Sequence, residues 1–142
     1  MEENLTFVPD KTEAEAMAYS PLVLAFLGDA AYELAIRTMI VSRGNGRPND
    51  LNRKSSRLVR AHAQSLAMDV IEPILTETEE NIYRRGRNAK SNTMAKNATM
   101  GDYRRATGFE ALIGYLYLTG QEERMLEIIR LGVLENEKQF RK

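Results

Sequence analysis

The chain has 142 residues, of which 43% are hydrophobic and 28% are charged, and its 20 basic and 20 acidic side chains cancel. This size and composition fit a single globular domain, and the absence of cysteine excludes disulfides, thiolate zinc sites and cysteine nucleophiles. The longest apolar run, 20–41, is interrupted by charges and is a poor membrane span, and no secretory signal is present, so we expect a cytoplasmic protein without membrane contact.

The chain opens with an arm and a short helix. Residues 1–11 lack hydrophobic periodicity and are expected to form an N-terminal arm. Thr12 followed three residues later by Glu15 is a capping-box pattern, which predicts a short helix that runs to about Ala18.

The next helix is the first of two with a core-type sequence. Ser20 and Pro21 suit the N-cap and first helical position, and the helix should end before Gly44 in a loop of Gly, Asn and Pro. It is apolar almost all round, which is typical of a buried central helix, yet it carries Asp29 and Glu33. A buried acid must be paired, hydrogen-bonded or bound to a cation.

Two more helices are expected in the middle of the chain. One is capped near Asn49 and should run to about Ile71, with its apolar residues on one side. Thr76 and Glu79 form a second capping box, which opens a helix through Arg85.

The last part of the chain is expected to hold a basic loop, two helices and a tail. Residues 86–101 are polar and rich in Asn, so we expect an exposed loop with at most one helical turn. The second core helix should span about 103–118, the last helix 121–134, and the tail 136–142 should be frayed. No alternating strand pattern occurs, so the sequence predicts an all-α bundle of six to seven helices in one domain, 1–142.

The second core helix repeats the anomaly of the first, because Glu110 stands in an otherwise apolar segment. Gly28 and Gly114 would let the two helices cross closely and bring Asp29 and Glu110 within reach of one cation. Magnesium is commonly held by one or two carboxylates with waters and substrate phosphates, so two acids suffice. We therefore predict a magnesium site there, suited to phosphodiester cleavage.

A purely structural interpretation of these acids stays open. In it, Asp29 forms a salt bridge with Arg37 or Arg105, and Glu110 caps or pairs locally. His62, the only histidine, lies between apolar positions and favours a structural role.

Charge is distributed in blocks along the chain. Residues 43–60 hold six basic side chains against one acid, and residues 84–105 hold seven against one, with the acidic stretch 69–80 between them. Such blocks are often solvated surface, but two basic blocks could converge on a phosphate-binding face. Few aromatic residues interleave with the charges, so recognition of a duplex backbone fits better than stacking on single strands.

Four segments together resemble the ribonuclease III catalytic domain, and most closely its short bacterial relatives, the Mini-III ribonucleases. The resemblance covers roughly residues 19–135 in the family's order. It rests on AFLGDA at 25–30, RPNDL at 47–51 with KSSR at 54–57, RGRNAKS at 85–91, and FEALIGYLYL at 109–118.

The resemblance implies a helical, homodimeric endonuclease that depends on magnesium, for which manganese could substitute. It implies cleavage of double-stranded RNA to 5′-phosphate ends, on a stem of precursor large-subunit (23S) ribosomal RNA, with a ribosomal protein as a candidate helper. Two acids of the family's usual four are missing, since Ala25 and Thr107 occupy their positions.

On this basis Asp29 and Glu110 are the predicted catalytic residues and metal ligands. A scaffold that binds RNA without cutting it and a magnesium nucleotide pyrophosphohydrolase remain as alternatives. The predicted RNA-contacting residues lie in the two basic blocks: Asn49, Lys54, Ser55, Arg57, Arg84, Arg85, Arg87, Asn88, Lys90, Ser91 and Lys96.

Overall fold

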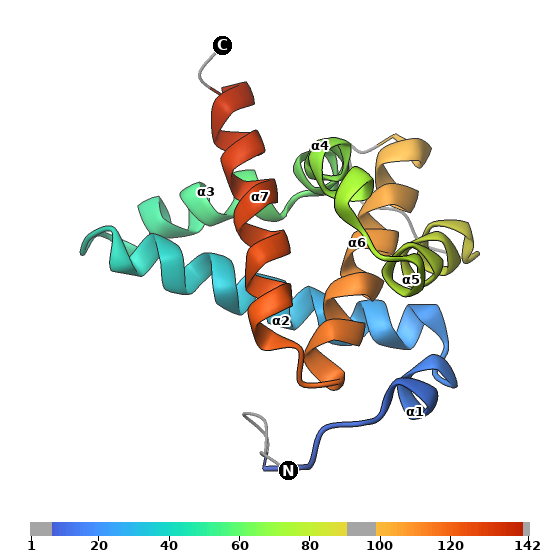
Figure 1. The fold of residues 1–142 in the computed structure, drawn as a ribbon. Helices are drawn as coiled ribbons and strands as arrows, with labels where there is room; N and C mark the ends of the chain where they lie inside the picture. The colour runs from blue at the N-terminus through green and yellow to red at the C-terminus, as the bar shows by residue number, and fades with distance from the viewer. Residues whose placement is uncertain (1–6, 91–98, 141–142) are drawn as a thin grey trace.

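A computed structural model describes residues 7–90 and 99–140 of the chain, and every element of these residues is helical (Figure 1). The all-α prediction is therefore confirmed. The elements are α1 (Glu13–Met17), α2 (Pro21–Ser42), α3 (Pro48–Val59), α4 (Ala61–Ile71), the 3-10 turn η1 (Glu72–Ile74), α5 (Glu77–Asn88), α6 (Met100–Leu118) and α7 (Glu122–Phe140).

Helix α6 is the centre of the bundle. It packs against α2, α4, α5 and α7, and Figure 1 shows α2 crossing it near its C-terminal half. Its apolar side chains Phe109, Leu112, Ile113 and Leu116 are fully buried. The near-continuous apolar pattern of α6 is thus explained by helices on several of its sides.

Two glycines allow α2 and α6 to touch through their backbones, as the sequence predicted. A Cβ added at Gly28 would lie 1.7 Å from the carbonyl oxygen of Glu110, and one at Gly114 would lie 1.9 Å from the carbonyl oxygen of Leu24. No other residue fits at either position without moving a helix.

Helix α5 meets α6 through a second glycine pair, and here the expected start of the loop at Gly86 was wrong. Helix α5 continues to Asn88, and Gly86 is buried, with its added Cβ only 2.9 Å from the Cα of Gly108. The glycine that suggested a loop is instead required for close helix packing.

The single helix predicted from Asn49 to Ile71 was also wrong, because it breaks at Arg60. That residue has extended backbone angles (φ −68°, ψ 157°), so α3 ends at Val59 and α4 begins at Ala61. The break frees carbonyl groups at the end of α3, which buried side chains bond instead.

The tail predicted to fray from residue 136 is helical through Phe140. Asn136 is fully buried, and Arg43 donates to both carboxylate oxygens of Glu137 at 2.8 and 3.1 Å. The guanidinium of Arg57 lies over the Phe140 ring, 5.7 Å from its centroid. The two arginines belong to the C-cap of α2 and to α3, which explains why local sequence did not reveal these contacts.

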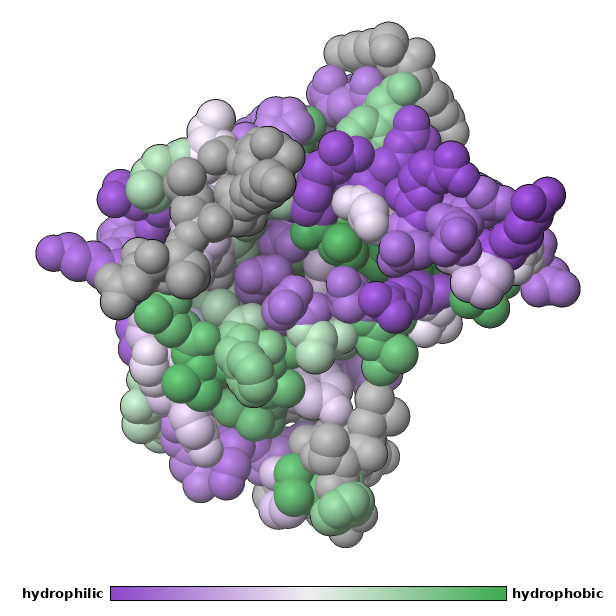
Figure 2. Space-filling model, turned by 180° about the vertical axis from the view of Figure 1, so that it is seen from behind, coloured by the Kyte–Doolittle hydropathy of each residue, from purple (hydrophilic) through white to green (hydrophobic). Residues whose placement is uncertain are grey.

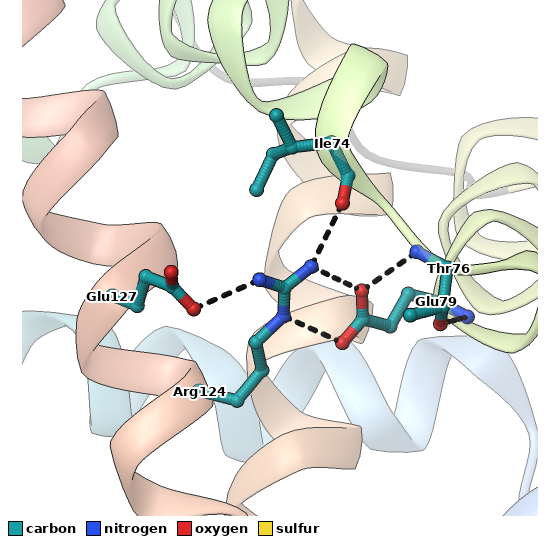
Figure 3. Close-up of polar contacts among 5 residues, drawn as sticks. All are labelled: Ile74, Thr76, Glu79, Arg124 and Glu127. Carbon is teal, nitrogen blue, oxygen red and sulfur yellow. Dashed lines mark hydrogen bonds and ion pairs between the residues drawn. The ribbon is translucent and has the colours of Figure 1, made fainter.

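Both capping boxes are confirmed at Thr12 and Thr76. The second one also anchors α7, because its Glu79 accepts two hydrogen bonds from Arg124 (Figure 3). In the part of the chain that the structure describes, we find no helix with the length and hydropathy needed to span a membrane.

Candidate active site

The crossing of α2 and α6 places Asp29 and Glu110 together. Gly28 contacts the backbone of Glu110 directly, so the next residue, Asp29, presents its carboxyl group to that of Glu110. Asp29 is solvent-exposed, contrary to the expectation of an inward-facing acid, whereas Glu110 is largely enclosed. The pair therefore has one half-buried and one exposed carboxylate.

The electrostatics of this pair are unfavourable for a negative charge. Burial raises the pKa of Glu110 to about 8, a hydrogen bond from Gln64 acts to lower it, and the nearby charges of Asp29 and Glu33 raise it. A bound cation would favour the ionised form of the Glu110 carboxyl, because its positive charge offsets the cost of burial and the repulsion from the two neighbouring acids.

The salt bridges considered for Asp29 in the structural interpretation are not formed. Arg37 pairs with Glu33 at 3.2 Å, and Arg105 pairs with Asp69 at 2.8 Å. Within residues 7–90 and 99–140, no lysine or arginine forms a salt bridge with either Asp29 or Glu110.

Gln64 is the residue of this site that sequence analysis missed. It is 2% exposed on α4, and its side-chain nitrogen donates to the Glu110 carboxylate at 3.2 Å and to the Val59 carbonyl at 2.7 Å. The only sequence signal was an uncharged amide within a largely apolar helix, which is too common to assign a role.

The positions of the two missing family acids are buried and offer no carboxylate. Ala25 lies in the core, and the Thr107 hydroxyl donates to the Tyr103 carbonyl at 2.9 Å. Among the described residues, no group of three or more His, Cys, Asp or Glu side chains could hold a metal. Two carboxylates nevertheless fit magnesium, which usually keeps several of its waters.

The predicted RNA-contacting residues of α3 are mostly exposed. Asn49, Lys54 and Arg57 lie on the surface, and the last two line a cavity of about 400 Å³ together with Arg43. Ser55 is buried instead, and its hydroxyl donates to the Asn52 carbonyl within the same helix.

The second predicted group lies at the C-terminal end of α5 and just beyond it. Arg84, Asn88 and Lys90 are exposed, and Arg87 is half-buried with its guanidinium over the Tyr83 ring. Arg85 donates to the carbonyls of Met17 and Tyr19, so it fastens the α1–α2 turn. Ser91 and Lys96 lie outside the described residues.

Helices α3 and α5 lie toward opposite ends of α2 (Figure 1). The described cations of α3 and α5 therefore do not merge into one patch on a single chain. The two candidate acids lie along α2 and α6, between these ends.

An apolar stripe runs along the outer face of α2. Phe26 is 82% exposed, and the large apolar residues exposed around it form the patch visible over this helix in Figure 2. They are Tyr19, Leu22, Val23 and Leu34. Exposed apolar patches of this kind are typical of interaction surfaces.

Comparison with known proteins identifies the class to which this fold and site belong. The model of the family described as "Ribonuclease III domain" matches residues 22–121. The chain belongs to the ribonuclease III domain family, and its activity is that of an endoribonuclease acting on RNA.

Within the family, the chain is similar to proteins named Mini-ribonuclease 3, as its sequence motifs indicated. The one from Brevibacillus brevis is 47% identical over 137 residues, which cover 95% of this chain and 97% of the relative. The one from Enterococcus faecalis is 53% identical over 76% of this chain and 83% of its own. A crystal structure of a Fusobacterium nucleatum protein superposes with a TM-score of 0.77 at 37% identity, covering 89% of this chain and 99% of that one.

Proposed function

We propose that this endoribonuclease cleaves double-stranded RNA with a magnesium ion held by Asp29 and Glu110. The observation that carries the proposal is the carboxylate pair on two helices whose backbones touch, with no basic side chain paired to either acid in the described part of the chain. When bound, the cation would activate a water and stabilise the leaving oxygen.

The protein's own contribution is to fix the two carboxylates. The contact between Gly28 and the Glu110 backbone sets the spacing of α2 and α6 and therefore the separation of the acids. Asp29 is exposed, while Glu110 is half-buried, and this partial burial strengthens its interaction with a cation.

We propose that the catalytic domain itself holds the RNA. The exposed cations of α3 and α5 supply phosphate contacts, and their positions at opposite ends of α2 suit an extended substrate. A duplex recognised by its shape, through phosphates and 2′-hydroxyls across the minor groove, fits such a surface.

We propose that the apolar stripe of α2 packs against the same stripe of a second chain. A surface with Phe26 82% exposed and Leu22, Val23 and Leu34 around it is costly in water, and a two-fold interface would bury both copies at once. Such a homodimer would carry two sites, one for each strand of the duplex.

The relatives' name, Mini-ribonuclease 3, supports RNA as the class of substrate. We propose the paired stem that borders precursor 23S ribosomal RNA, with a ribosomal protein as a helper. Manganese could replace magnesium, since both accept oxygen ligands.

The test is incubation of the purified protein with an end-labelled RNA duplex, in magnesium and in chelator, beside Asp29→Asn and Glu110→Gln. We expect staggered cuts that require magnesium and disappear in both variants. Binding without cutting by the unaltered protein, on a ribosomal precursor stem as well, would favour the scaffold function, because Ala25 and Thr107 supply no carboxylates.

A further inference from the structure

We infer that Gln64 is a positioning residue that orients Glu110 and ties the candidate metal site to the end of α3. The inference rests on the proposed function. It adds to the site a residue that neither its charge nor a sequence motif indicated.

The first step is the break between α3 and α4. In a continuous helix the carbonyls of Leu58 and Val59 would accept the amides of residues 62 and 63. The extended backbone of Arg60 prevents this, so both carbonyls need other donors.

Two buried side chains from other parts of the bundle supply these donors. The Tyr32 hydroxyl on α2 donates to the Leu58 carbonyl at 2.9 Å, and the Gln64 amide on α4 donates to the Val59 carbonyl at 2.7 Å. The end of α3 is therefore held from two sides.

The same Gln64 nitrogen reaches Glu110, at 3.2 Å from Oε2. A glutamine NH₂ group has two hydrogens, and here one serves the Val59 carbonyl and the other serves the carboxylate. Because both partners are acceptors, the amide cannot rotate by 180° without losing them. The orientation of Glu110 is thus fixed by a backbone group at the end of α3.

The oxygen atom of the same Gln64 amide provides a second, independent observation. The Gln64 Oε1 atom is buried and has no hydrogen-bond partner within the described chain, which is rare for a native buried oxygen. A free acceptor on the same amide that donates to Glu110 suits a donor that arrives with a hydrated cation.

The functional consequence is a link between RNA contact and the site. Lys54 and Arg57 lie on α3, and the carbonyl of Val59, the last residue of that helix, orients Gln64 and, through it, Glu110. A shift of α3 on binding a duplex would therefore change the orientation of the Glu110 carboxylate.

The test measures cation binding in the absence of RNA. Gln64→Met keeps the size of the side chain but cannot donate, and we expect its Mn²⁺ affinity, measured by electron paramagnetic resonance, to fall at least about 10-fold. Tyr32→Phe is the matched control, because it frees the neighbouring carbonyl without removing a hydrogen bond to Glu110, and it should keep its affinity.

A second measurement uses the unaltered protein, in case Gln64→Met does not fold. In ¹H–¹⁵N spectra, the side-chain amide of Gln64 should shift on addition of Mg²⁺, whereas those of Gln121, which precedes α7, and Gln139, near the C-terminal end of α7, should not.

The outcomes separate the two proposals. If the unaltered protein binds no divalent cation, the proposed metal function fails, and this inference fails with it. If it binds cations but Gln64→Met binds them equally well, or Tyr32→Phe loses as much, or the Gln64 amide does not respond to Mg²⁺, the positioning role alone is overturned.

Discussion

Arg124 of α7 donates a hydrogen bond to each carboxylate oxygen of Glu79 on α5, at 2.8 and 2.9 Å, and a third to the Ile74 carbonyl at 2.9 Å (Figure 3). Burial acts to raise the pKa of Glu79, but the hydrogen bonds from Arg124 and from the Thr76 backbone outweigh it and hold the pKa below 4.5. One ion pair therefore joins the last helix to the N-terminus of α5.

Replacing Glu79 by Gln should lower the free energy of unfolding at neutral pH by about 2–3 kcal/mol, because a largely buried charge loses its partner. Since the folded-state pKa is depressed, the pair stabilises the fold above about pH 4.5, and this is lost as the pH falls through the folded pKa. Urea unfolding measured at several pH values across this range should show that the free energy of unfolding depends less on pH in the variant than in the unaltered protein. Glu127→Gln, which removes the exposed partner of Arg124, should cost less than about 1 kcal/mol.

Gly28→Ala should prevent the normal packing of α2 on α6, because the new methyl group would meet the Glu110 backbone. Circular dichroism and thermal unfolding should show a severely destabilised protein. Gly101→Ala is the control in the first turn of α6, where the nearest atom to an added Cβ is 4.0 Å away. It should stabilise the fold by up to about 1 kcal/mol, and equal behaviour of the two variants would contradict the close crossing.

Phe26→Asp should convert the proposed dimer of the 16.1 kDa chain into a monomer, because it places a charge in the centre of the exposed α2 stripe. Light scattering after size-exclusion chromatography measures the mass directly. Leu134→Asp, on an equally apolar but separate exposed position of α7, should leave the mass unchanged. A monomeric unaltered protein would rule out the proposed interface.

Loss of Arg84 and Arg87 should affect RNA binding, whereas loss of Arg85 should affect the stability of the fold. Arg84→Gln with Arg87→Gln should weaken duplex binding and reduce the slope of log affinity against log salt by up to about 2, because each lost phosphate contact removes about one unit. Arg85→Gln should mainly lower stability, since Arg85 bonds the Met17 and Tyr19 carbonyls. The reverse pattern would place Arg85 on the RNA.

The sequence was most informative where the signal is local or where composition is unusual. The cap at Ser20 and both capping boxes were predicted correctly, because a few adjacent residues determine them. The crossing of α2 and α6 was also predicted, because Gly28 and Gly114 interrupt otherwise apolar helices for no local reason.

The errors arose where distant residues decide the structure. The break at Arg60 has neither Gly nor Pro, and its freed carbonyls are bonded by Tyr32 and Gln64 from other helices. The end of α7 is held by Arg43 and Arg57, which lie about a hundred and about eighty residues earlier in the chain. Apart from Gln64, which is five residues from Val59, these partners lie too far along the chain to be recognised from a window of sequence.

The enclosure of α6 by α2, α4, α5 and α7 also determines how its backbone exchanges hydrogen with solvent. Amides of residues 109–116 can exchange only when several helices separate together, so their protection should report the stability of the whole domain. Amides near the Arg60 break need only local opening. Among the described helices, a deuterium-exchange map should therefore show slow exchange at the Glu110 backbone and faster exchange next to the Arg60 break.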